Sequence, residues 1–350
     1  WFDSGVAPWA SLGYPRNKNL FSKMWPADFI LEGPDQIRGW WNSLMITSVI
    51  TFNRRSFDNV LFHGFVLDSH GIKMSKSKGN AVEPEKLIEK HGRDVSRFYF
   101  LSGAPWEDYY FKWEDLDEVA KSFVIIKNTF NFVKTYVTNA GKPKNLKLED
   151  RWLLSKLNSL VANCTNYCKT FNAQKAASEI SSFILNDFSR WYVKLVRDRV
   201  WVTYKGKDRQ SAFYTLLYTT ETLLKLFAPF TPMLAEHLYQ TVVKPLRKGK
   251  ESIHMYNWPK ADKKFIDKKL EDSMSIVKQL VEASSAARNQ ANLKLRWPVR
   301  EVLVVSADRK VNSAVKQLKE ILLSACNSKG IKTVKKRPAG QFSSIKLPFG

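Results

Sequence analysis

The chain has 350 residues, of which 44% are hydrophobic, and its 56 Lys and Arg against 33 Asp and Glu give a formal net charge of +23. This length and apolar content predict two or three folded domains, and the charge predicts a polyanionic partner. No run approaches the roughly 18 apolar residues of a membrane span, and no signal peptide is recognisable, so we expect no membrane partner. Three cysteines without a C-x-x-C pair predict reduced thiols, no metal site and a cytoplasmic protein.

Residues 28–52 predict a strand, a Gly-Pro turn and a helix that ends near Phe52. Ligands in open α/β sheets bind at the carboxyl ends of strands, so residues just after this strand are candidates for reading a small molecule. These candidates are Glu32, Gly33, Asp35 and Gln36. Simpler explanations stay open for single residues, since Asp35 is also suited to capping the helix and Trp40 to the core.

Residues 60–67 predict a strand that leads into the string KMSKSKGN at residues 73–80. The string holds three lysines and two serines, with Gly71 before it and Gly79 at its end. Glycines let the backbone move, and lysine ammonium groups are adaptable charges for phosphate. Such a loop can close over a triphosphate and neutralise the charge of a departing pyrophosphate. By lysine spacing alone, a solvated surface run is the alternative.

Helices are predicted over Glu83–Gly92 and Arg93–Leu101, and the 3.6-residue period then predicts a bundle with helices near 115–138, 150–170, 173–205, 208–228 and 231–245. Four residues at steps of four, three and four would share one face of the third bundle helix: Arg190, Lys194, Arg197 and Trp201. A basic stripe that ends in an aromatic ring can hold an RNA backbone and stack a base. Alternatively, Trp191 and Trp201 belong to the core, and the arginines pair with Asp187 and Asp198.

The last hundred residues predict a small α/β module. Its expected elements are a helix near 266–291, a strand over Val302–Val305, a helix over Asn312–Cys326 and later short strands. Residues 241–350 hold 24 Lys and Arg against 9 Asp and Glu, which makes this the most basic part of the chain. The run Lys335-Lys336-Arg337 either contacts phosphates or is a solvated tail.

Four strings resemble class I aminoacyl-tRNA synthetases, and in particular the isoleucyl-tRNA synthetase family. KMSKSKGN resembles the class signature loop, and EGPDQIRGW at 32–40 matches the adenylate-binding segment of isoleucyl enzymes. WFDSG at 1–5 resembles the point where the isoleucyl chain re-enters its catalytic domain, and NDFSRWYVKLVRDR at 186–199 is close to a string of the same family. Valyl enzymes usually carry Ser where Asp3 stands, which favours isoleucine. A valyl enzyme and a non-catalytic tRNA-binding fragment stay open as alternatives.

The resemblance implies a multi-domain fold. Residues 1–112 would be the C-terminal part of a Rossmann-like α/β catalytic domain, 113–248 an α-helical anticodon-binding domain, and 249–350 a C-terminal α/β module that contacts tRNA. The family's upstream H-x-G-H motif does not occur, and His63 and His70 lack the required partner histidine. We therefore expect that the N-terminal part of the same enzyme is missing from this chain and that the 350 residues alone are inactive.

The resemblance also implies roles for single residues. Lys76, assisted by Lys73, would stabilise the departing phosphates in catalysis. ATP and adenylate would be bound by the four residues at 32–36 named above and by three loop residues, Met74, Ser75 and Ser77. Trp1 and Trp40 would line the L-isoleucine pocket, and the stripe from Arg190 to Trp201 would contact tRNA(Ile). Mg²⁺ would arrive with ATP, and no metal ligand is assignable.

Overall fold

The computed structural model describes residues 1–139, 141–336 and 344–347. The chain forms two compact units. The first comprises Trp1–Lys121 and Tyr167–Ala177, and the second comprises Ser122–Asn166 and Ser178–Gly350. Across the described ranges, no helix is long and apolar enough to cross a membrane.

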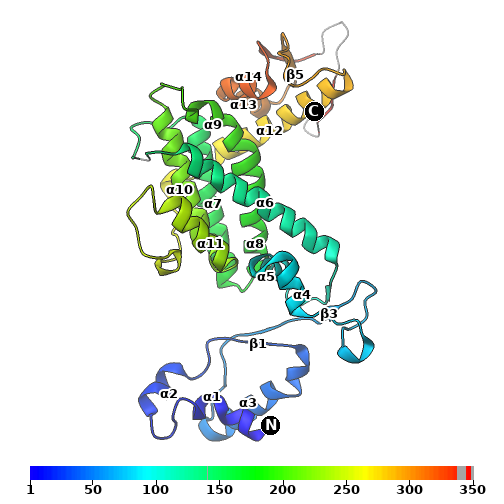
Figure 1. Ribbon diagram of the computed structural model, residues 1–350, viewed down its shortest axis with the longest axis vertical. Coiled ribbons are helices and arrows are strands. Elements are labelled where there is room, and N and C mark those ends of the chain that lie inside the picture. Colours follow the sequence, from blue (N-terminus) through cyan, green and yellow to red (C-terminus); the bar gives the residue numbers. More distant parts are fainter. Residues whose placement is uncertain (140, 337–343, 348–350) are drawn as a thin grey trace. The chain divides into compact units, whose positions relative to one another are not determined.

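The first unit opens with helices that the sequence reading did not anticipate, α1 (Phe2–Ala10) and α2 (Lys18–Met24). Helix α1 packs on α3 (Trp40–Phe52), as Figure 1 shows. The contact is close because Gly5 lies against α3, where an added Cβ would stand 2.9 Å from the Ser43 carbonyl oxygen. Thr47 Oγ1 donates to the Gly5 carbonyl oxygen at 2.8 Å. These contacts fix the start of the chain beside the segment 28–52.

The predicted strand, turn and helix of residues 28–52 are confirmed. Strand β1 (Ile30–Glu32) pairs in parallel with β2 (Val60–Phe62), and a 3₁₀ turn, η1 (Pro34–Ile37), leads from β1 toward α3. The single strand expected over 60–67 is wrong. The chain leaves β2 at His63 and forms β3 (Val66–Leu67), which pairs in parallel with β4 (Tyr109–Tyr110) in a separate sheet. The break falls at Gly64, where a Cβ would stand 2.1 Å from the Glu107 carbonyl oxygen.

After β3 the chain forms the 3₁₀ turn η2 (Lys76–Lys78) and the two predicted helices, α4 (Pro84–His91) and α5 (Arg93–Leu101). The bundle helices follow, and their bounds lie within a few residues of the expected ones. They are α6 (Trp113–Tyr136), α7 (Leu148–Lys169), α8 (Ala173–Ser182), α9 (Lys194–Val200), α10 (Arg209–Phe227) and α11 (Pro232–Leu238), the last continued by the π-helical η4 (Tyr239–Val243). The long helix expected over 173–205 is wrong in detail, because the π-helical segment η3 (Phe183–Val193) separates α8 from α9 and the backbone turns extended at Trp201.

The C-terminal part of the second unit has the predicted α/β character (Figure 1). Short 3₁₀ turns, η5 (Ile253–Met255) and η6 (Lys263–Phe265), precede α12 (Lys268–Gln290). Strand β5 (Val302–Val305) pairs in parallel with β6 (Ile331–Val334). The helix expected over 312–326 is two helices, α13 (Arg309–Gln317) and α14 (Lys319–Cys326), which meet at the buried Leu318.

A buried ionic cluster joins three helices of the bundle. Arg199 of α9 is 6% exposed and forms a bidentate contact with Asp150 of α7, with N···O distances of 3.0 and 2.8 Å. Its guanidinium also pairs with Glu149 at 2.7 Å and with Asp208, at the start of α10, at 3.1 Å. Tyr192 donates to Asp150 at 2.7 Å, and burial raises the pKa of Tyr192 well above its usual value, so it remains a neutral donor. The cluster satisfies charges that would be costly to bury alone.

The Arg199 cluster predicts a large stability difference between two arginines of one helix. Arg199→Met leaves buried carboxylates without their cation, so we expect the free energy of unfolding to fall by about 3–5 kcal/mol. The matched control is Arg197→Met, because Arg197 is exposed on the same helix, and its effect should stay within about 0.5 kcal/mol. Denaturant unfolding followed by tryptophan fluorescence measures both variants. Equal, small effects would show that the cluster is not a main support of the bundle.

Candidate functional site

The residues after β1 form a compact set of hydrogen bonds at the start of α3. The Gln36 side chain donates to Asp35 Oδ2 at 2.9 Å, and its Oε1 accepts from the Trp40 backbone N–H at 3.0 Å. Gln36 therefore satisfies an N–H group at the helix start, and the capping role considered for Asp35 is not seen. Gly33 is buried, and an added Cβ there would stand 2.6 Å from Asp35 Oδ1. The structure thus brings Gly33, Asp35 and Gln36 together, with exposed Glu32 at the strand end.

The two tryptophans expected in an amino-acid pocket are both near Gly39, since Trp40 follows it in the chain and the Trp1 ring lies against it. An added Cβ at Gly39 would stand 3.3 Å from the Trp1 ring and 2.8 Å from Gln36 Oε1, so a larger residue there would require both side chains to shift. Trp1 is 77% exposed. Trp40 is half-buried, and its indole N–H donates to the Ser4 carbonyl oxygen at 2.9 Å. The sequence did not indicate Ser4, because it contributes through its backbone carbonyl group, which every residue type has.

Residues 73–80, called the lysine loop here, have a backbone held by hydrogen bonds and lysine side chains that are exposed. Asp68 Oδ2 accepts from the Asn80 side-chain amide at 2.8 Å, and Asn80 Oδ1 accepts from the Ser75 backbone N–H at 3.0 Å. Lys73 and Lys76 are both exposed, and the ammonium group of Lys73 stands 3.6 Å from the ring centroid of Phe65. Such a contact is a cation–π interaction.

The other predicted loop residues also differ in exposure. Met74 and Ser75 are half-buried, and exposed Ser77 lies 3.2 Å from Ser75 between their hydroxyl oxygens. Sequence reasoning quoted Asn80 within the string but gave it no role, and it missed Asp68 and Phe65. Within the described residues, no hydrogen bond or ion pair joins this loop to residues 32–40.

The predicted basic stripe is exposed along its whole length. Arg190, Lys194, Arg197 and Trp201 all lie at the surface, although Arg190 belongs to the π-helical segment and the other three follow it. The pairing of these arginines with Asp187 and Asp198 is not seen: Asp187 is an ion-pair partner of Lys278 and Lys156, and Arg190 donates to Asn186 at 3.0 Å. Trp191 is a core residue, as considered, whereas Trp201 is not.

Trp201 stands beside a second aromatic ring that sequence reasoning did not find. The ring of Trp201, which is 49% exposed, lies 5.6 Å from the half-buried Tyr136 ring at an interplanar angle of 32°. Tyr136 in turn lies 4.7 Å from Phe132 on α6. An exposed indole at the end of a cationic stripe is suited to stacking a nucleic-acid base. Arg337 of the predicted basic run lies outside the described residues, and Lys335 and Lys336 are exposed.

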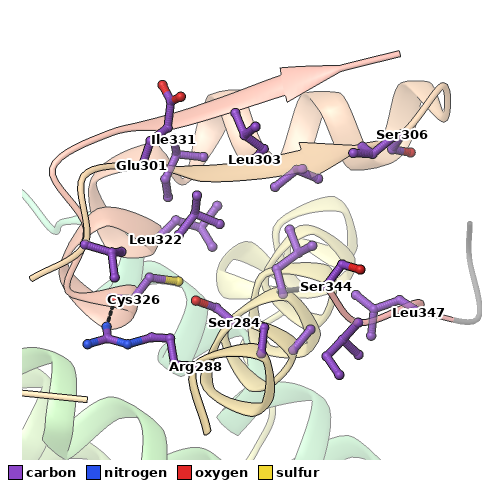
Figure 2. A pocket seen from close by; sticks show the side chains of 18 of the residues that line it. Ser284, Arg288, Glu301, Leu303, Ser306, Leu322, Cys326, Ile331, Ser344 and Leu347 are labelled. Atoms are coloured by element: carbon purple, nitrogen blue, oxygen red, sulfur yellow. Dashed lines mark hydrogen bonds between the residues drawn. The ribbon is translucent and has the colours of Figure 1, made fainter. Parts of the chain in front are cut away.

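The second unit also contains an apolar cavity, which includes no predicted site residue. It has a volume of about 560 Å³ and lies between α12, β5 and α14. Figure 2 shows that Leu303 and Leu322 line it opposite Ser284 of α12, with Leu347 at one end. Arg288 stands at its edge and donates to the Cys326 carbonyl oxygen at 2.9 Å (Figure 2). Across the described residues, no group of three or more His, Cys, Asp or Glu could hold a metal ion.

Two family models match the chain. Residues 1–112 match the model described as tRNA synthetases class I (I, L, M and V), and residues 150–304 match the anticodon-binding domain of tRNA ligase. The first match contains the lysine loop and residues 32–40, and the second contains the stripe and, apart from Glu149, the ionic cluster around Arg199. The chain therefore belongs to the class I tRNA synthetases.

Within this family the chain is similar to isoleucine-tRNA ligases. It is 44% identical to the isoleucine-tRNA ligase of Pyrococcus abyssi over 95% of its own length, and the match covers 32% of that protein. The enzyme of the same name from Archaeoglobus fulgidus is 43% identical, again over 95% of this chain and 33% of the relative. The chain thus spans about a third of the length of these relatives.

A solved structure shows the same fold. The ternary complex of Agrobacterium radiobacter K84 LeuRS with tRNA and LeuAMS superposes with a TM-score of 0.58 and 19% sequence identity. The superposition covers 76% of this chain and 33% of that chain. This likeness concerns the fold alone.

Proposed function

We propose that this chain is part of an isoleucine-tRNA ligase, which activates L-isoleucine with ATP and transfers it to tRNA(Ile). The observation that carries the proposal is the similarity to isoleucine-tRNA ligases along 95% of the chain, since it includes the lysine loop and the bundle alike. The activity belongs to a longer protein, because the chain spans about a third of its relatives. No covalent protein intermediate is needed, and the chemistry rests on proximity and electrostatic stabilisation.

The roles proposed for the lysine loop follow from its charge and exposure. Lys76 and Lys73 are exposed ammonium groups on a held backbone, a combination that suits contact with the phosphates as pyrophosphate leaves. Met74, Ser75 and Ser77 would border the bound ATP. Mg²⁺ enters as part of the MgATP substrate, since it binds ATP through phosphate oxygens and needs few protein ligands.

Glu32, Gly33, Asp35 and Gln36 are proposed to bind the adenylate at the end of β1. Trp1 and Trp40 are proposed as walls of the isoleucine pocket, because broad, rigid indoles suit a branched aliphatic side chain. The hydrogen bond from Trp40 to Ser4 and the close fit at Gly39 would hold these walls in place. A valyl enzyme is the weaker candidate, because the relatives reported above are named isoleucine-tRNA ligases.

The domain division stays as proposed from the sequence. Residues 1–112 belong to the catalytic domain, 113–248 to the anticodon-binding bundle, and 249–350 to a C-terminal module that contacts tRNA. The stripe of Arg190, Lys194 and Arg197 would hold the tRNA backbone, and Trp201 would stack an exposed base. We assign the enzyme to the cytoplasm, where its cysteine thiols would stay reduced.

Lys76 provides the direct test of the loop. In the full-length enzyme, Lys76→Ala should slow isoleucine-dependent ATP-pyrophosphate exchange by roughly 10²-fold, the scale of one lost preorganised contact to developing charge. Lys78→Ala is the matched control, because it removes the same charge from the same exposed loop, and it should change the rate by less than about threefold. Equal losses in both variants would mean that the loop acts only through its total charge.

The stripe predicts how the 350-residue chain binds tRNA. Its affinity should fall steeply as salt rises, with a modest preference for tRNA(Ile) that shrinks when the anticodon is changed. Arg197→Ala should lower the slope of log affinity against log salt by about 1. The control is Lys121→Ala, since Lys121 already pairs with Glu118 at 2.6 Å, and its slope should stay unchanged.

Filter binding at several salt concentrations, with tRNA(Ile), an anticodon-swapped tRNA(Ile) and an unrelated tRNA, measures these quantities. Trp201→Ala should reduce the preference for tRNA(Ile) and leave the salt slope unchanged, because stacking does not release counterions. Equal affinity of the wild-type chain for all three tRNAs would remove anticodon reading from this bundle.

A further inference from the structure

A pair of side chains closes the base of the lysine loop. Asp68 follows β3 directly, and Asn80 follows the loop glycine Gly79. The Asn80 amide nitrogen donates to Asp68 Oδ2 at 2.8 Å. Asp68 Oδ1 accepts from the backbone N–H groups of His70 and Ile72 at 3.0 and 2.9 Å. Both carboxylate oxygens of Asp68 are therefore used, one for the turn that starts the loop and one for the residue that ends it.

Asn80 is suited to this place because it uses both ends of its amide. While its nitrogen donates to Asp68, its Oδ1 accepts from the Ser75 backbone N–H at 3.0 Å. A carboxylate here would lack the donor, and an aliphatic side chain would lack both groups. Hydrogen bonds from Asn80 and from the Ile72 backbone hold the pKa of Asp68 below its usual value, so the carboxylate is charged at neutral pH.

The pair acts on the backbone that carries the proposed catalytic lysines. Ser75, which Asn80 holds, is the residue immediately before the η2 turn, and this turn begins with Lys76. On the other side of Ser75, the Met74 N–H donates to the Val66 carbonyl oxygen at 3.3 Å, which ties the Lys73 end of the loop to β3. Without the pair, the exposed residues between 68 and 80 would sample many conformations, and the two lysines would be misplaced for most of the time.

We propose that Asp68 and Asn80 form a clasp that fixes the base of the lysine loop and so places Lys73 and Lys76 for adenylate formation. They are positioning residues, because their hydrogen bonds are to the loop backbone and to each other. The inference rests on the proposed function and adds two residues to it, Asp68 and Asn80. The clasp holds the backbone, while Gly79, with φ +68° and open space around its Cα, and the exposed lysine side chains keep the freedom to meet ATP.

The hydrogen-bond pattern provides a sharp test by exchange of the two side chains. Asp68→Asn places an amide nitrogen opposite the amide nitrogen of Asn80, and Asn80→Asp places two carboxylates opposite each other. Each single variant therefore loses the clasp. In the double variant Asp68→Asn/Asn80→Asp, the amide at 68 donates to the carboxylate at 80, and that carboxylate still accepts from Ser75. The double variant keeps every hydrogen bond of the clasp, and only the bond between residues 68 and 80 has its donor and acceptor reversed.

The measurement is isoleucine-dependent ATP-pyrophosphate exchange by the full-length enzyme. Each single variant should lose about 10- to 100-fold in kcat, the range expected when reacting groups are misplaced by about 1 Å, with the KM for isoleucine unchanged. The double variant should recover to within about threefold of the wild type. Wild-type rates in both single variants, or a double variant no faster than the single ones, would overturn the clasp.

Hydrogen exchange of the Ser75 backbone amide tests the clasp independently of the proposed function, because it can be measured without any enzymatic activity. Exchange there should be faster in both single variants and return to the wild-type rate in the double variant, while the unfolding midpoint of all three stays near that of the wild type. Unchanged exchange at Ser75 in the single variants would overturn the clasp by itself. If the wild-type enzyme showed no isoleucine-dependent ATP-pyrophosphate exchange, the proposed function would be overturned, and with it the catalytic role of the clasp.

Discussion

The bidentate contact between Arg199 and Asp150 is the interaction on which the bundle depends. It is buried, it joins α9 to α7, and through Asp208 it reaches the start of α10. Because Arg199 points into the bundle, α9 can present Arg197 only on its outer side, and the chain leaves the helix at Trp201 with its indole exposed. The proposed tRNA surface is thus a consequence of an ion pair inside the bundle. Burial of such a cluster is costly unless every partner is present, which ties the surface to an intact core.

The lysine loop likewise presents cationic side chains from a backbone that other residues hold in place. Hydrogen bonds of Asp68 and Asn80 hold its backbone, whereas its lysine side chains are exposed. A charge that stabilises a transition state contributes most when its position is set before the reaction begins. The ammonium group of Lys73 lies over the Phe65 ring, a contact that leaves its side chain exposed. Both proposed sites therefore combine a fixed backbone with available cationic groups.

Much of this architecture could be predicted from the sequence, because helical periodicity is a local property. The bundle helices lie close to their predicted bounds, and the strand, turn and helix of residues 28–52 were placed correctly. The errors have two sources, contacts distant in sequence and local helix geometry that residue spacing does not reveal. The division of the strand at Gly64 depends on the backbone at Glu107, and the π-helical segment before α9 leaves no mark in residue spacing. The roles of Asp68 and Asn80 depend on hydrogen bonds that form only after folding.

The central claim, that this chain belongs to an enzyme that selects isoleucine, is tested most directly by the amino-acid dependence of ATP-pyrophosphate exchange. The wild-type full-length protein should be assayed with isoleucine and with valine, and the ratio of kcat/KM values compared. A pocket that distinguishes one methylene favours the larger side chain by about 10- to 200-fold. We expect exchange with isoleucine and a ratio in this range. Equal or faster exchange with valine, or none with either amino acid, would contradict it.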